Sequence, residues 1–173
     1  MRKTLRACLF ILFLLVIKTE ANAQAKIDET NLLTRLSSLN ALNVADAGQY
    51  FTDHGYSLLS KQTIPQATFS LDLYKYKIKD QTSSYNLTVI AGQVSASGCI
   101  TYSEDEYQQA LKLIKDAGFV PGEATSPESG KTIYAKGNLR FMIQKKAAAN
   151  GSVFYVMQLS DLMRIAELSG LKK

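Results

Sequence analysis

The sequence predicts an α+β domain, in which an antiparallel sheet carries helices packed on one of its faces. Two segments end in the manner of helices, Asp53-His54-Gly55-Tyr56 and Asp116-Ala117-Gly118-Phe119. In both, a glycine that readily adopts the left-handed conformation precedes an aromatic residue that folds back onto the last turn. Strand-like sequence follows each end, and Gly137-Asn138 and Asn150-Gly151 are typical of tight hairpins. This succession of helices and antiparallel strands indicates the α+β class.

The two helix ends recur along the chain. Gly55 and Gly118 are 63 residues apart, and this spacing predicts two tandem helix-plus-hairpin units. We place the units at about residues 43–102 and 103–160, followed by a C-terminal helix over residues 161–169.

The first 23 residues have the three-part layout of a secretory signal peptide. A basic start precedes an unbroken apolar run from Cys8 to Ile17, and Ala21-Asn22-Ala23 supplies the small residues that a signal peptidase reads. An apolar run of this length is too short to span a bilayer, which needs about 20 residues. We therefore expect cleavage near Ala23 and a single mature domain over residues 24–173. We expect this domain to be exported, either to the periplasm or out of the cell, and to have no membrane-spanning segment.

The charge balance changes once the signal peptide is set aside. The chain of 173 residues has 20 basic and 15 acidic residues, and the signal holds four of the basic and one of the acidic ones. The mature net charge of +2 argues against nucleic-acid binding, which requires a concentrated basic excess. Cys99 is the single mature cysteine, so no disulfide can form within the mature chain.

The first half begins with two predicted helices. Apolar residues at helical spacing predict a helix within residues 27–42. These residues are Ile27, Leu32, Leu36 and Leu39. Asn43 then caps a second helix that ends near His54.

Strands are expected to follow. Apolar residues alternate with polar ones from Phe69 to Leu73, and they alternate in the opposite phase from Tyr74 to Ile78. Such a slip requires a bulge or two short strands. Further strands are predicted at Leu87–Ala91 and Cys99–Tyr102.

The second half has the best-marked helix. Ser103 and Glu106 form a capping box at its start, with Tyr102 and Tyr107 placed to pack across it. A loop over residues 122–129 leads to three strands in series. They are expected at Thr132–Lys136, Leu139–Lys146 and Ser152–Leu159, before a last helix capped by Ser160.

No set of residues indicates catalysis, a metal or a cofactor. Ser129-Gly130-Lys131-Thr132 looks like the end of a phosphate-binding loop, but Thr125 replaces the required earlier glycine and a hairpin follows. One histidine, His54, and one mature thiol, Cys99, are too few for a zinc site, and we expect both to be structural. The acidic cluster Glu104-Asp105-Glu106 lies where negative charge stabilises the start of a helix. We therefore predict a non-catalytic protein.

A ribbon of alternating tyrosines and lysines is the most distinctive surface feature. Alternation places the tyrosines and Ile78 on one side of a strand and the lysines on the other. The lysines form either a stripe for an acidic partner, aided by Arg140, or the solvated face of an edge strand that resists pairing. The candidate partner-binding residues are Tyr74, Lys75, Tyr76, Lys77, Lys79 and Arg140.

A second feature that bears on surface recognition is an apolar segment near the C-terminus. Residues 153–157 are apolar at consecutive positions, which predicts a central strand covered on both faces. Helices cover one face, and the other is covered either by burial within the domain, which we expect, or by a partner, a ligand or a second subunit.

The Ala21-Asn22-Ala23-Gln24 junction resembles those of exported proteins of Gram-negative bacteria. The two helix ends at 53–56 and 116–119, each followed by antiparallel strands, are similar in plan to β-lactamase-inhibitor-protein-like and PepSY-like tandem domains. The resemblance covers about residues 43–159. It implies a non-catalytic binder or inhibitor in the envelope or outside it.

These observations lead to one functional expectation and two alternatives. We expect an exported binding or inhibitor-like module that recognises a protein or cell-envelope component through its sheet face. The alternatives are a hydrolase that acts on cell-envelope material through scattered carboxylates, and a carrier of a small apolar ligand.

Overall fold

The computed structural model describes residues 27–78, 83–122 and 130–170. The predicted signal peptide, Lys79 and most of the predicted loop at 122–129 lie outside the described residues. The described part contains an eight-stranded antiparallel sheet and four helices. Within these ranges no helix has the length and apolar character needed to cross a membrane.

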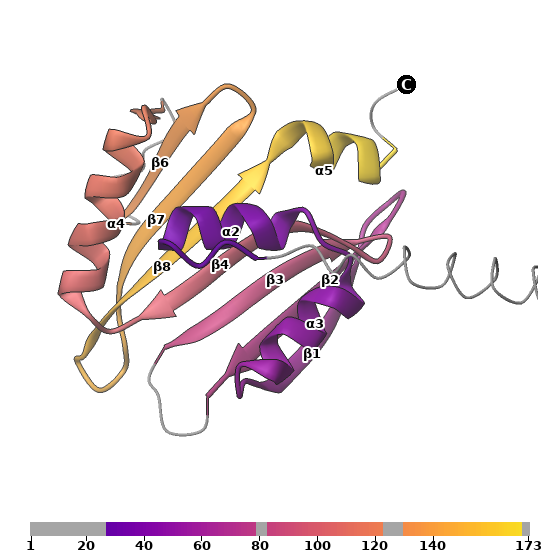
Figure 1. The fold of residues 1–173 in the computed structure, drawn as a ribbon, viewed down its shortest axis with the longest axis horizontal. Coiled ribbons are helices and arrows are strands. Elements are labelled where there is room, and N and C mark those ends of the chain that lie inside the picture. The colour runs from indigo at the N-terminus through magenta and orange to yellow at the C-terminus, as the bar shows by residue number, and fades with distance from the viewer. Residues whose placement is uncertain (1–26, 79–82, 123–129, 171–173) are drawn as a thin grey trace, which may run out of the picture.

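The sheet consists of two runs of four strands that meet in its middle (Figure 1). Its order is β1-β2-β3-β4-β8-β7-β6-β5, and neighbouring strands are antiparallel. The first run comprises β1 (Ser57–Pro65), β2 (Ser70–Lys77), β3 (Ser84–Ile90) and β4 (Gln93–Thr101). The second comprises β5 (Val120–Pro121), β6 (Lys131–Lys136), β7 (Leu139–Ala147) and β8 (Val153–Asp161). The predicted α+β class is confirmed.

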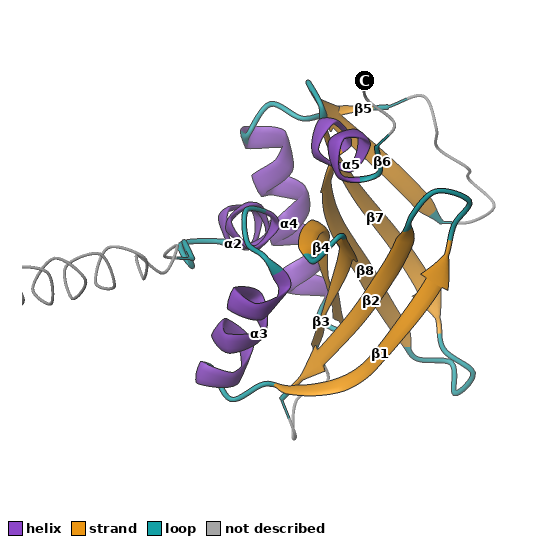
Figure 2. Cartoon of the chain, turned by 90° about the vertical axis from the view of Figure 1, so that its right-hand side faces the viewer, coloured by secondary structure: helices purple, strands orange, loops and turns teal. Residues whose placement is uncertain are grey.

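Three helices cover one face of the sheet, as Figure 2 shows. They are α2 (Leu32–Asn40), α3 (Val44–Asp53) and α4 (Glu104–Asp116). A fourth helix, α5 (Leu162–Leu168), contacts β4 and β8 at one end of the sheet. The core lies between the three helices and the sheet, and its fully buried side chains include Leu36, Leu39, Phe51, Ile114 and Phe141.

The first helix is shorter than the sequence predicts. It begins at Leu32, because Asn31 caps it: the Asn31 side chain accepts a hydrogen bond from the Thr34 amide at 3.0 Å, and Thr34 Oγ1 accepts one from the Asn31 amide at 3.2 Å. Ile27 precedes the helix and still packs against the core. Ile27 therefore contributes to the core but does not belong to the helix.

Both predicted helix ends are confirmed. Gly55 and Gly118 have φ of 78° and 81°, in the left-handed region that glycine adopts without strain. The Tyr56 amide donates to the Phe51 carbonyl at 2.8 Å, and the Phe119 amide donates to the Ile114 carbonyl at 2.9 Å. These bonds satisfy carbonyls that the last helical turn leaves unpaired, and they direct the chain back toward the sheet.

The predicted slip in the strand at 69–78 is wrong. β2 is a single regular strand, with Leu71 and Leu73 on one face and Tyr74 and Tyr76 on the other. The change of phase arises because both faces of this strand carry apolar residues. The register shifts lie elsewhere, in β1 at Leu58/Ser60 and in the pairing of β3 with β4.

Two predicted helix starts need a correction. Ser103 caps α4 as predicted, since its hydroxyl accepts from the Glu106 amide at 3.2 Å, but the Ser103 amide donates to Thr101 Oγ1 at 3.0 Å instead of to Glu106. The cap of α5 is Asp161 and not Ser160. The Asp161 carboxylate accepts from the Met163 amide at 2.9 Å, because a carboxylate is a strong acceptor for the free amides of a first turn.

Candidate functional site

The sheet face that α2, α3 and α4 leave uncovered is the candidate functional site, and we call it the open face. Successive residues of a strand point to opposite sides, and the registers align these sets across the whole sheet. Tyr85, Leu87, Met157 and Leu159 are buried on the helix side. The alternate positions of the same strands therefore form the open face.

The open face combines positive charge with apolar side chains. Among the strand residues that the structure describes, it holds five cationic side chains and no carboxylate. The cations are Lys75 and Lys77 on β2, Lys131 on β6, and Arg140 and Lys146 on β7. The two acidic residues of the described strands lie elsewhere: Asp72 is on the helix side, and Asp161 caps α5.

Negative charge gathers on the opposite side of the molecule. Helix α3 carries Asp46 and Asp53, and α4 carries Glu104, Asp105 and Glu106 in its first turn. The helix side also carries lysines, among them Lys112 and Lys115 on α4, so both signs of charge occur there, whereas the charged residues of the open face in the described strands are all cations.

The structure divides the predicted partner-binding residues between the two faces. Lys75 and Lys77 lie on the open face, as the alternation predicts. Tyr74 and Tyr76 lie on the helix face, where Tyr76 is buried and stacks on Phe51 with ring centroids 4.4 Å apart. The tyrosines thus hold β2 to the helices, and the lysines are presented on the other side. Lys79 lies outside the described residues.

Arg140 shares the open face with these lysines but lies far from them. Three strands separate β2 from β7, which places Arg140 about 19 Å from the lysines of β2. Its Nη1 donates to the Gly137 and Leu139 carbonyls at 2.7 and 2.9 Å. Positive charge therefore occurs in both halves of the open face instead of forming one stripe.

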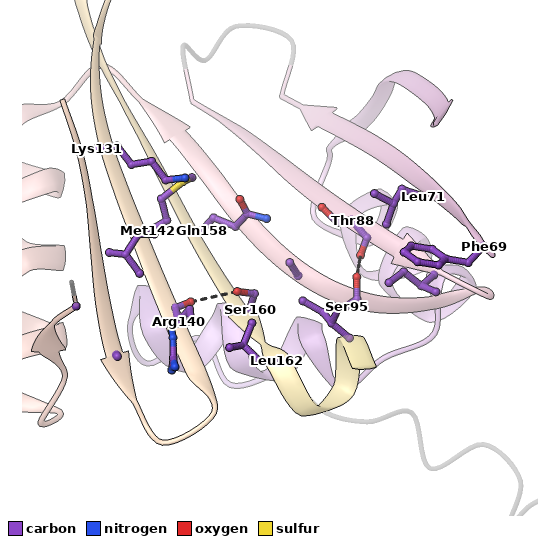
Figure 3. Close-up of a pocket in the computed structure, with 16 residues that line it drawn as sticks. Phe69, Leu71, Thr88, Ser95, Lys131, Arg140, Met142, Gln158, Ser160 and Leu162 are labelled. Atoms are coloured by element: carbon purple, nitrogen blue, oxygen red, sulfur yellow. Dashed lines mark hydrogen bonds between the residues drawn. The ribbon is translucent and has the colours of Figure 1, made fainter. Parts of the chain in front are cut away.

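A groove of about 790 Å³ lies in the open face near α5. Its lining is mainly apolar, and Lys131 and Arg140 are its charged residues. In Figure 3, Phe69 and Leu71 of the first half lie opposite Met142 and Arg140 of the second half, with Gln158 and Ser160 between them. The apolar residues include Phe69, Leu71, Ile90, Ile133, Met142 and Leu162.

Helix α5 closes one end of the groove. Arg164 fixes this helix to β4 through a hydrogen bond from Nε to the Val94 carbonyl at 2.9 Å. Leu162 and Ile165 line the groove, and the Leu162 side chain remains 44% exposed. The C-terminal helix thus supplies apolar surface to the open face as well as packing.

A smaller hollow of about 390 Å³ adjoins the groove and shares Thr88 and Gln158 with it. Lys75 and Asn86 line this hollow, as does Gly98, which lies where β4 meets β8. A Cβ atom at Gly98 would lie 2.4 Å from the Met157 carbonyl oxygen. Glycine is therefore required for the close approach of the two halves at this point.

The residues considered for catalysis are buried or contact other residues of the fold. Cys99 is buried, and burial raises its pKa to about 12, so the reactive thiolate is disfavoured. His54 Nε2 lies 2.9 Å from a Glu29 carboxylate oxygen at the end of α3. Glu104 accepts hydrogen bonds from the Tyr155 hydroxyl and, at 2.8 Å, from Gln108 Nε2. No group of three or more potential metal ligands occurs within the described ranges.

Sequence reasoning missed several residues of the open face. Lys131 was considered as part of a phosphate-binding loop, and the apolar residues of the groove come from segments far apart in the sequence. Gly98 carried a signal that was overlooked: a glycine inside a strand marks a close approach of another backbone. Residues 153–157 lie in β8, which is central as predicted, but the predicted cover on both faces is wrong within the described residues: Phe154 and Val156 lie on the open face and stay partly exposed.

Comparison of the chain with protein-family models, with curated protein sequences and with solved structures finds no match.

Proposed function

We propose that this protein is an exported, non-catalytic binding module whose open face recognises an acidic surface of a protein partner. The observation that carries the proposal is the open face with five cations and no carboxylate among its described strand residues. Such a face attracts an acidic surface and repels a basic one, so that charge selects the partner and its orientation.

The apolar groove supports a protein as the partner. Protein interfaces have an apolar centre surrounded by polar and charged groups. The groove supplies the apolar centre, and the lysines of β2 and of β6–β7 lie on either side of it. In this proposal the chain contains two tandem units, residues 43–102 and 103–160, and each unit contributes half of the open face. This arrangement of two units is similar in plan to that of the inhibitor-like tandem domains of the bacterial envelope.

The test is a charge reversal with a matched control. The double variant Lys75→Glu/Lys77→Glu reverses two charges on the open face, and Lys112→Glu/Lys115→Glu makes the same change in net charge on the exposed surface of α4. Each variant and the unchanged protein are immobilised, and the proteins retained from an envelope extract are compared by mass spectrometry.

The proposal expects a protein that the unchanged module and the α4 variant retain equally. The open-face variant should bind it at least about fourfold more weakly, because each exposed charge pair contributes about 0.2–1 kcal/mol and reversal of two charges replaces both attractions by comparable repulsions. A partner lost equally from both variants, or from neither, would contradict recognition through the open face.

A further inference from the structure

A second cavity lies on the helix side of the sheet, between α2 and α4, and we call it the α2–α4 cavity. Its volume is about 450 Å³, within the range of small-molecule sites in proteins. Residues of α2 and α4 form its walls, and β3, β4 and β8 form its floor. It lies on the opposite side of the sheet from the open face, and it shares only Ile100 and Met157 with the hollow of about 390 Å³ there.

Arg35 provides a positive charge in this cavity. Its Nη1 donates to the Tyr85 hydroxyl at 2.6 Å, whereas its Nε is buried and has no hydrogen-bond partner among the described residues. A buried donor of a charged group that lacks an acceptor is costly. Nε has almost no accessible surface, so a carboxylate bound in the cavity would pair with the guanidinium through its other nitrogens, in the charge-assisted geometry that guanidinium prefers.

Glu106 lines the same cavity at its solvent-exposed side and provides a negative charge there. Neither Glu106 nor Arg35 forms a salt bridge with another residue that the structure describes. Both charges act on the Cys99 thiol: burial has the largest effect on the pKa of this group, Glu106 raises the pKa further, and Arg35 lowers it. The two charges therefore lie within electrostatic reach of one point in the cavity.

The composition of the cavity limits what can bind. A phosphate or a dicarboxylate would meet Glu106 with the same sign of charge, and an amine without a carboxylate would leave Arg35 unpaired. Cys99, Met157 and Leu113 add apolar surface to the lining. The complementary ligand carries one carboxylate, one ammonium group and an apolar side chain.

We propose that the α2–α4 cavity binds a small zwitterion of the apolar α-amino acid class, with the carboxylate on Arg35 and the ammonium group on Glu106. The Tyr85 hydroxyl holds the guanidinium in place through the bond from Nη1, and the apolar side chain of the ligand lies against the floor of the cavity.

Isothermal titration of the purified protein with L-leucine, L-methionine and L-phenylalanine tests this site. At least one of them should bind with a Kd below about 1 mM. The analogue of the tightest binder that lacks the carboxylate should bind at least about tenfold more weakly, because it loses the pair with the half-buried Arg35. The analogue that lacks the ammonium should bind about two- to fivefold more weakly, because the pair that it loses is with the exposed Glu106. For leucine these analogues are 4-methylpentanoate and 3-methylbutylamine.

Two variants test whether Arg35 binds the carboxylate of the ligand and Glu106 its ammonium group. Arg35→Met should lose the amino acid, and Glu106→Gln should weaken its binding about two- to fivefold, the range of an exposed charge pair, without weakening the carboxylate-only analogue. Asp105→Asn, which removes a neighbouring carboxylate outside the cavity, is the matched control and should bind as the unchanged protein does. Because Arg35 is half-buried, its replacement can perturb folding, and the Glu106 variant provides an independent test. Absence of binding by all three amino acids, equal binding of the analogues, or unchanged binding by Glu106→Gln would overturn the proposal.

Discussion

Substitution of Gly98 by alanine tests how the two halves of the sheet are joined. Gly98 lies on β4 opposite Gln158 of β8, at the junction of the two four-stranded runs. An added Cβ would lie 2.4 Å from the Met157 carbonyl oxygen and 3.2 Å from both Cα and Cβ of Gln158. The first of these atoms belongs to the backbone, so no change of rotamer can relieve the clash.

The size of the effect follows from this geometry. Carbon–oxygen contacts in sheets occur at about 3.3–3.6 Å, so the Cβ and the carbonyl must separate by about 0.9–1.2 Å. Strand β8 is held between β4 and β7, and a shift of this size lengthens ladder hydrogen bonds on one side or the other. Overpacking of this kind typically costs about 1–3 kcal/mol, and we expect Gly98→Ala to lie at the upper end of that range.

Urea denaturation followed by circular dichroism measures the free energy of unfolding of this variant. Gly48→Ala is the matched control, because Gly48 lies inside α3 and its added Cβ would meet the Tyr76 hydroxyl at an ordinary 3.4 Å. Alanine in a helix interior is favoured over glycine by about 0.5–1 kcal/mol, so the control should be stabilised. Equal stability of Gly98→Ala and the unchanged protein would refute a close approach of β4 and β8.

Three further predictions concern the stability of the helix side of the molecule: a core residue, a helix cap and the pH dependence of unfolding. Phe51→Ala should lower the free energy of unfolding by about 3–5 kcal/mol, because Phe51 is fully buried and stacks on Tyr76; a loss below about 1 kcal/mol in urea denaturation would contradict this packing. Ser103→Ala should cost about 1 kcal/mol by removing the cap of α4, whereas Ser103→Asn should retain most of the stability, and equal loss in both would count against the cap. Burial raises the pKa of Cys99 from 9.0 and that of Tyr85 from 10.0, each to about 12. Both groups therefore lose their protons at a lower pH in the unfolded chain than in the folded protein. The free energy of unfolding should be highest below pH 9 and fall as the pH rises toward 12. Cys99→Ala should flatten the part of this decline between pH 9 and 10, and an unchanged profile would contradict the burial of the thiol.

Helix ends and hairpins were predictable because local chemistry determines them. Gly55 and Gly118 close α3 and α4 through backbone bonds that only nearby residues supply. The hairpin at Gly137-Asn138 joins β6 and β7 as its sequence indicates. β1 was missed because nearly all of it is exposed, so it shows no apolar alternation that a sequence pattern could reveal.

The open face itself was only partly predictable. Alternation separates Lys75 and Lys77 from Tyr74 and Tyr76, but sequence alone does not say which side the helices cover. Burial of Tyr76 on Phe51 decides this, and it depends on a contact between α3 and β2. The groove and the α2–α4 cavity are each assembled from elements distant in the sequence, so neither had a local signal.

Lysine footprinting tests the central claim, recognition through the open face, most directly. The protein is acetylated briefly, either free or bound to its captured partner, and the modification of each lysine is measured by mass spectrometry. Lys75, Lys77, Lys131 and Lys146 on the open face should be protected in the complex, whereas Lys112 and Lys115 on α4 should react as in the free protein. Protection of the two α4 lysines with unchanged reactivity of the open-face lysines would contradict the account.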